Sequence, residues 1–166
     1  MSYLPLRLPP GEDLRHALEA TATAPGSGSF VVSGIGSLWH PRLRFAAAEA
    51  ETQLKGPFEI LTLSGSITAE GAHLHIAVAD GQGQVIGGHL CYGSRVRTTA
   101  EILTVRPEGW QLRRLHDATT GYLELQVQGL SGKACRPSVQ AANAQAVDRT
   151  PASEADAAAG GTMGSA

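Results

Sequence analysis

Hydrophobic and polar positions alternate along most of the first 130 residues, in short runs separated by glycine and proline. Alternation of this kind is typical of strands that bury one face. It predicts strands at residues 30–38, 58–65, 73–79, 84–91, 95–105 and 122–127. The segment 43–53 stays ambiguous, because its alanines favour a helix while its first residues alternate like a strand.

One stretch near the N-terminus has helical spacing instead. Leu14, Ala17 and Leu18 recur every three or four residues, after the prolines and acidic residues of 9–13. Proline is tolerated in a first helical turn, and acidic groups there complement the helix dipole. We expect a helix over about 9–23. With the strands, it predicts an α+β domain of mainly antiparallel sheet with one or two helices.

The composition changes after residue 130. Residues 131–166 are rich in Ala, Gly, Ser, Thr and Gln, and their only large apolar side chains are Val139, Val147 and Met163. So little apolar surface cannot offset the entropy lost on ordering the chain. The sequence therefore predicts a folded domain at 1–130 and a disordered Ala/Gly/Ser-rich tail at 131–166.

The composition of the whole chain narrows the class of protein. The 166 residues are 42% hydrophobic, enough for the core of one domain, and the formal net charge of −2 draws the chain to neither nucleic acid nor membrane. No apolar run approaches the ~20 residues of a membrane helix. Cys91 and Cys135 are interpreted as free thiols. We expect a cytoplasmic protein without membrane contact.

Candidate metal ligands occur in the strand predicted at 73–79. His73 and His75 are two residues apart, so their side chains leave the same face of the strand, opposite its apolar residues. His89, in the next predicted strand, joins them only if the hairpin loop has an odd number of residues, because a one-residue slip turns every side chain to the other face.

A three-residue loop at 81–83 fits this condition. This common hairpin type needs a left-handed residue at its last position, and Gly83 supplies one. It would place His89 opposite His75, with Cβ atoms ~5 Å apart. Three neutral imidazoles suit zinc and leave a fourth position for water, an anion or a group from another subunit. The alternative is that the histidines are ordinary polar residues on a solvated or interfacial face.

The other histidines and the paired arginines are not expected to form a binding site. His16, His40 and His116 are expected to be surface or capping residues. The arginine pairs are expected to form a solvated face rather than a DNA track, which needs a clustered basic surface. These pairs are Arg42/Arg44, Arg95/Arg97 and Arg113/Arg114.

Several motifs together resemble the PPC (plants and prokaryotes conserved) domain. They are Arg7-Leu8, Gly11-Glu12-Asp13-Leu14, Ser33-Gly34-Ile35-Gly36-Ser37, Gly56-Pro57-Phe58-Glu59-Ile60-Leu61 with Leu63-Ser64-Gly65, and His73-Leu74-His75-Ile76 with Gly87-Gly88-His89-Leu90. The resemblance implies a PPC-like α+β fold and a homotrimer. It also implies a metal site at His73, His75 and His89, often assigned to zinc in prokaryotic members.

Plant members join this domain to an AT-hook, a basic Arg-Gly-Arg segment that enters the minor groove of DNA. This sequence has no such segment, so we expect DNA binding to be weak or absent. We favour a small homotrimeric metal-binding protein with a regulatory or accessory role. The alternatives are a metal-dependent enzyme acting on a small ligand and a DNA-associated protein. The sequence assigns no catalytic residue.

Overall fold

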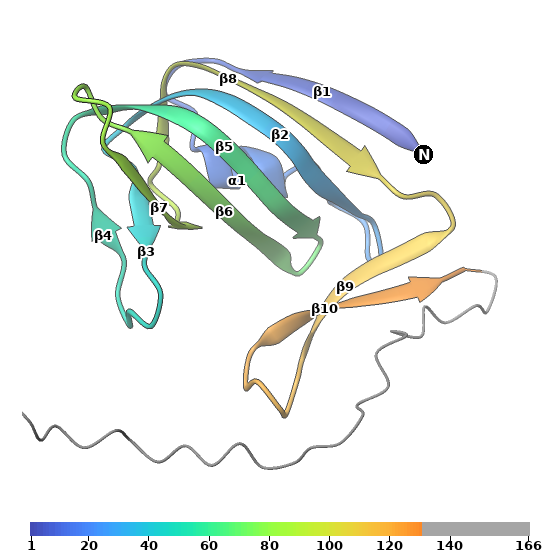
Figure 1. The fold of residues 1–166 in the computed structure, drawn as a ribbon. Helices are drawn as coiled ribbons and strands as arrows, with labels where there is room; N and C mark the ends of the chain where they lie inside the picture. Colours follow the sequence, from blue (N-terminus) through green and yellow to red (C-terminus); the bar gives the residue numbers. More distant parts are fainter. Residues whose placement is uncertain (131–166) are drawn as a thin grey trace, which may run out of the picture. The chain divides into compact units, whose positions relative to one another are not determined.

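The computed structural model describes residues 1–130; the tail predicted at 131–166 lies outside these described residues. The main sheet contains β1 (Ser2–Leu8), β2 (Gly28–Trp39), β3 (Arg42–Arg44), β4 (Thr52–Gln53), β5 (Pro57–Thr68), β6 (Gly71–Ala79), β7 (Val85–Leu90) and β8 (Arg95–Arg106). Their order across the sheet is β1-β8-β2-β5-β6-β7-β3-β4, and every neighbouring pair is antiparallel (Figure 1). β9 (Trp110–His116) and β10 (Leu123–Gly129) form a separate hairpin.

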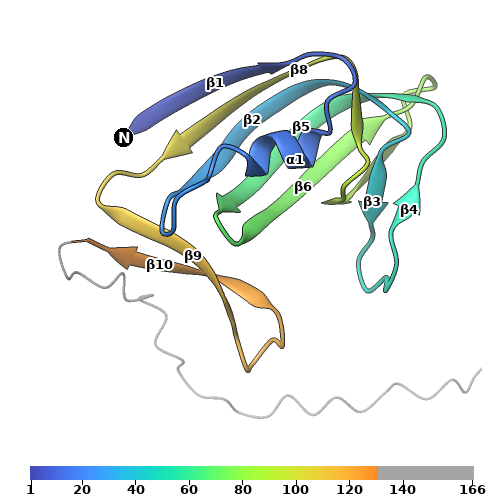
Figure 2. The same cartoon turned by 180° about the vertical axis from the view of Figure 1, so that it is seen from behind.

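The single helix of the described chain, α1 (Leu14–Glu19), lies in the hollow of the curved sheet, as Figure 2 shows from behind. Leu14 and Leu18 of this helix are fully buried against the sheet. The apolar faces of the central strands complete the core, with Leu38, Leu63, Ile67, Leu74, Ile76 and Val78 among its members. The α+β expectation is thus confirmed. The opposite face of the sheet is exposed and carries polar side chains together with several apolar ones.

The helix is shorter than predicted. Asp13 is extended and acts as the N-cap, its side chain accepting a hydrogen bond from the backbone N–H of His16 at 3.0 Å. The preceding Gly11 donates its N–H to the carbonyl of Val96, so the prolines belong to a loop held against the sheet. No helix within residues 1–130 is long and apolar enough to cross a bilayer.

The pattern also missed two strands and left one segment open. β1 escaped notice because both of its faces are largely exposed and Pro5 interrupts it, as is common in edge strands. β9 was missed because charged and apolar residues mix in it. The ambiguous segment 43–53 contributes the short strands β3 and β4 and no helix.

Candidate metal centre

The hairpin between β6 and β7 sets the register of the candidate site. Gly83 has a φ of +78°, and its N–H donates to the carbonyl of Asp80 at 3.0 Å. The Asp80 carboxylate also accepts from the backbone N–H groups of Gln82 and Gln84, each at 2.9 Å. Ala79 pairs with Val85, and His75 therefore pairs with His89. The predicted register, with three loop residues, is confirmed.

The three imidazoles converge on one point outside the sheet. The Nε2 atoms of His73 and His75 are 3.1 Å apart, and the ring centroids are 4.9 Å apart for His73–His75, 5.0 Å for His73–His89 and 4.6 Å for His75–His89. One nitrogen of each ring lies within 4.8 Å of the others. Nitrogens bound at ~2.1 Å to one tetrahedral zinc lie ~3.4 Å apart. Small rotations of the rings would bring all three to that spacing, so the set fits a metal ion.

The site continues as a row of paired residues across four strands. Ser64 of β5 pairs with His75 of β6, His75 with His89 of β7, and His89 with Arg44 of β3. Directly paired residues in a sheet point to the same face. Backbone pairing alone thus places one hydroxyl, two imidazoles and one guanidinium side by side.

The tight turn between β5 and β6 fixes this alignment, since the pairing runs without a break from Thr68 and Gly71 to Thr62 and Ala77. A bulge in β5 follows: Ile60 pairs with Val78, so Leu61 is the extra residue. Without the bulge, Leu61 would pair with Val78 and displace Ile60 from the core face. Bulges of this kind re-aim side chains and are common beside functional sites.

Small residues leave a hollow of about 390 Å³ beside His75 and His89. Ala77 and Gly87 pair with each other in the next row toward the hairpin loop, where larger side chains would fill this space. The rest of the lining comes from β3 and the loop after it, from β5 and β6, and from the backbone before His89. These residues are Arg44, Ala46, Thr62, Ser64, Ile76 and Gly88.

Glycine is required at position 65 of β5, where the backbone lies directly against that of His73. Gly65 has a φ of +145°, and a Cβ built on it would lie 2.0 Å from the carbonyl oxygen of His73. A side chain at this position cannot be accommodated without moving one of the two strands. Gly65 therefore fixes the distance between β5 and the strand that carries two of the histidines.

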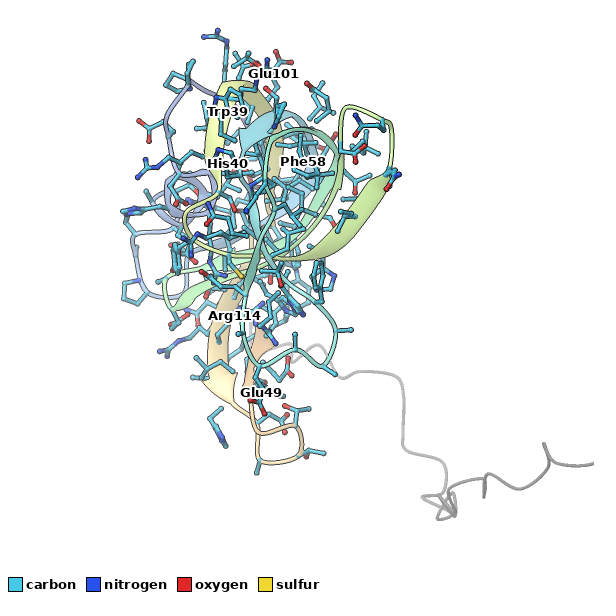
Figure 3. All side chains as sticks on the ribbon, turned by 90° about the vertical axis from the view of Figure 1, so that its left-hand side faces the viewer. Trp39, His40, Glu49, Phe58, Glu101 and Arg114 are labelled. Carbon is cyan, nitrogen blue, oxygen red and sulfur yellow. The ribbon has the colours of Figure 1, made fainter. Side chains whose placement is uncertain are left out.

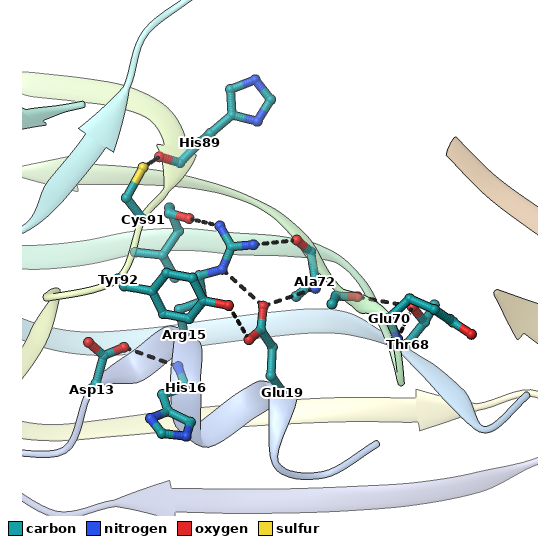
Figure 4. Close-up of polar contacts among 12 residues, drawn as sticks. Asp13, Arg15, His16, Glu19, Thr68, Glu70, Ala72, His89, Cys91 and Tyr92 are labelled. Atoms are coloured by element: carbon teal, nitrogen blue, oxygen red, sulfur yellow. Dashed lines mark hydrogen bonds and ion pairs between the residues drawn. The ribbon is translucent and has the colours of Figure 1, made fainter. Parts of the chain in front are cut away.

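The helix supports the site from the opposite face of the sheet. Arg15 donates to the carbonyls of Leu90 and Ala72, each at 2.9 Å, which are the neighbours of His89 and His73 in the chain. Glu19 accepts from Arg15 and from the N–H of Ala72, each at 3.0 Å. In Figure 4 the His89 ring points away from this network, so Arg15 and Glu19 position the strands without entering the site.

Arg114 is a buried cation near the other end of the site. Its side chain donates to the hydroxyl of Ser66 at 2.7 Å and to the carbonyl of Leu123 at 3.0 Å, and Ser66 pairs with His73. Figure 3 shows Arg114 where the β9–β10 hairpin meets the main sheet. Only 8% of the residue is exposed, so the expectation that Arg114 belongs to a solvated face is wrong. Its strand was not recognised, and its burial was therefore not foreseen.

Burial and neighbouring positive charges lower the pKa of two of the three histidines, His73 and His89. Burial lowers the pKa of His73, and the positive charges of Arg114, His75 and His89 lower it further. Burial also lowers the pKa of His89, with additional contributions from His75, Arg44 and Arg15. Neutral imidazole is the form that binds metals. The electrostatics therefore favour the ligand state near neutral pH.

The remaining histidines take no part in the cluster. His40 has a structural role, since its Nδ1 accepts the N–H of Gly56 at 2.9 Å. Cys91 is a free thiol, as predicted, whereas Cys135 lies beyond the part of the chain that the structure describes. The sequence missed Arg44, Thr62 and Ser64 as members of the site. Only the pairing of β3 and β5 with their neighbours could have revealed them.

Comparison with known sequences places the first 106 residues in the Plants and Prokaryotes Conserved (PCC) domain. A protein of Synechococcus sp. named bifunctional protein GlmU is 45% identical over 139 residues, which cover 83% of this chain and 22% of that protein. The chain thus spans less than a quarter of the length of this relative.

Solved structures with the same fold come from bacteria and archaea. A hypothetical protein from Salmonella is 35% identical with a TM-score of 0.73, over 77% of this chain and 94% of its own. A metal-containing protein from Archaeoglobus fulgidus is 25% identical with a TM-score of 0.60, over 75% and 92%. A protein from Ralstonia eutropha, described as a candidate DNA-binding protein, is 25% identical with a TM-score of 0.59, over 73% and 88%.

Proposed function

Because this chain belongs to the Plants and Prokaryotes Conserved (PCC) domain family, we propose that it is a small metal-binding protein with a regulatory or accessory role. His73, His75 and His89 are the proposed ligands, and zinc is the proposed ion. The observation that carries the proposal is the convergence of three ring nitrogens within 4.8 Å on an exposed sheet face. The similar Archaeoglobus protein, described as metal-containing, supports it.

The accessory role is supported by the greater length of the Synechococcus relative. That protein, named bifunctional, is several times longer than the stretch similar to this chain. A PCC domain therefore occurs there beside other polypeptide, as expected of a module that serves a larger function. The proposed cellular compartment is the cytoplasm.

A homotrimer is the proposed assembly. Several large apolar side chains of β2, β5 and β7 are exposed on the single chain, among them Val32, Ile35, Leu61 and Val85. Exposed apolar surface on neighbouring strands, here β2 and β5, is typical of a protein interface. The family resemblance supplies the number three.

A metal-dependent enzyme is the second candidate, because the hollow beside His75 and His89 could admit a small ligand next to the open position of the metal. None of the residues that line this hollow in the described chain is a carboxylate that could serve as a general base. We therefore rank metal binding above catalysis.

The test is metal analysis of full-length protein purified without an affinity tag and in a neutral buffer. We expect about one zinc per chain after zinc loading and dialysis. The variant His75→Ala should lose the metal, whereas His116→Ala, which removes an exposed histidine of β9, should keep it. Equal zinc content in both variants would refute the proposed ligands.

A further inference from the structure

Arg44 introduces a positive charge at the edge of the histidine cluster. It pairs with His89 across β3 and β7, and it lines the hollow next to His75. Within residues 1–130, its guanidinium has neither an ion pair nor a hydrogen bond. Other arginines here are engaged: Arg42 pairs with Glu51, and Arg113 pairs with Glu70. Arg44 is thus available to a molecule that enters the hollow.

Two hydroxyl groups face the same space. Ser64 pairs with His75, and Thr62 pairs with Ala77. Both side chains therefore point to the face of the sheet that carries the histidines. Both residues line the hollow and are exposed, and neither hydroxyl has a hydrogen-bond partner within the described chain. Hydroxyls and a guanidinium around one space offer donors from several directions.

The charges around the hollow determine which sign of charge a ligand should carry. Its lining contains Arg44, His75 and His89, and no carboxylate. A divalent ion on three neutral imidazoles retains its full positive charge. A guanidinium forms paired, charge-assisted hydrogen bonds with carboxylate or phosphate groups. A ligand that reaches both the ion and Arg44 is therefore expected to be negatively charged.

We infer that the fourth ligand of the proposed metal is an oxyanion, the carboxylate or phosphate group of a small molecule, which Arg44 holds from the side of β3. Thr62 and Ser64 bind the same group or its nearest polar substituent. The hollow of about 390 Å³ is near the lower end of the range for small-molecule sites, so the ligand is a metabolite-sized anion rather than a polymer. This inference rests on the metal site proposed above.

Cobalt(II) provides the test, because the visible bands of cobalt bound to the full-length chain change when its fourth ligand is exchanged. The cobalt-loaded protein is titrated with inorganic phosphate and, separately, with malonate, at constant ionic strength. We expect saturable band changes with at least one of them and none with sodium chloride. The anion that saturates at the lower concentration identifies the phosphate or carboxylate class.

Arg44→Gln should weaken anion binding by roughly tenfold or more, the loss typical of one charge-assisted hydrogen bond, while the affinity for cobalt stays unchanged. Arg7→Gln is the matched control, because Arg7 is an exposed arginine of β1, and it should bind the anion normally. The inference would be overturned if the cobalt bands changed with neither anion, or if Arg44→Gln and the parent chain bound the anion equally well. Either result would still be consistent with the proposed metal site. Absence of cobalt bands would overturn the metal site and the oxyanion site together.

Discussion

His75 and His89 face each other across β6 and β7 with their ring centroids 4.6 Å apart. They are fourteen positions apart in the chain numbering, and only the three loop residues of the hairpin between them place both on the same face. The site therefore depends on the number of residues in the loop as much as on the identity of its ligands.

Deletion of Gly87 should abolish the cluster. It keeps the three-residue loop but brings His89 one position nearer to that loop, opposite Ile76 and thus on the apolar face of β7. We expect zinc affinity, measured by competition with a chromogenic chelator, to fall to that of the His75→Ala variant. Gln82→Ala changes neither the loop length nor this spacing and should bind zinc normally, because the backbone N–H of Gln82 still reaches Asp80. Tight zinc binding after the deletion would show that the spacing between the loop and His89 does not set the register.

Arg114 and Arg113 are neighbours in β9 but should differ in their contribution to stability. Arg114→Met removes buried hydrogen bonds to Ser66 and Leu123, and we expect the free energy of unfolding to fall by about 2 kcal/mol. Arg113 forms a half-exposed ion pair with Glu70, so Arg113→Ala should cost less than about 1 kcal/mol. Urea denaturation of both variants measures the difference, and equal losses would contradict the assignment of Arg114 as a buried structural cation.

Gly65→Ala should destabilise the protein strongly. The new Cβ would overlap the carbonyl oxygen of His73, and the backbone at Gly65 has a positive φ. A loss of at least about 2 kcal/mol is expected. Gly81→Ala is the control, since a Cβ there meets nothing within 4 Å and should change the melting temperature little. A Gly65→Ala protein as stable as this control would mean that β5 and β6 are farther apart than described.

The metal-free protein should lose stability as the pH falls through the range in which histidine titrates. Burial and nearby cations lower the pKa of His73 and His89 in the folded state below the ordinary 6.5 of the unfolded chain. The unfolded state then binds more protons, so this contribution is complete above about pH 6.5 and declines below it. Melting temperatures between about pH 8 and pH 5 measure the decline. It should be shallower in the double variant His73→Gln/His89→Gln; identical slopes would refute the role of these two histidines.

Light scattering should give three times the chain mass of 17.3 kDa at micromolar concentration. Ile35→Glu places a charge among the exposed apolar side chains of the main sheet and should shift the mass toward one chain. Glu108→Lys, at an exposed position between β8 and β9, is the control and should leave the mass unchanged. A single-chain mass for the parent protein would rule out the trimer.

The sequence predicted those features that depend on neighbours in the chain. The period-two pattern around His75 indicated its face, and Gly83 indicated the loop that brings His89 opposite it. The contribution of Arg44 could not be predicted, because it depends on the pairing of β7 with β3, a strand distant in sequence. Ser64 is nearer in the chain, but its place opposite His75 depends on the tight turn after Thr68, which the alternating pattern did not indicate. Arg114 was misjudged for a related reason: its burial comes from contact between the second hairpin and the main sheet.

The extra residue at Leu61 has a consequence for tracing the ancestry of this site. Upstream of it, β5 pairs in one frame with β6, and downstream in another. A homologue that lacks this one residue would pair β5 with β6 regularly and still place a serine opposite its second histidine, because the deletion removes only the bulge. A gap near Leu61 in an alignment therefore does not mark relatives that have lost the site.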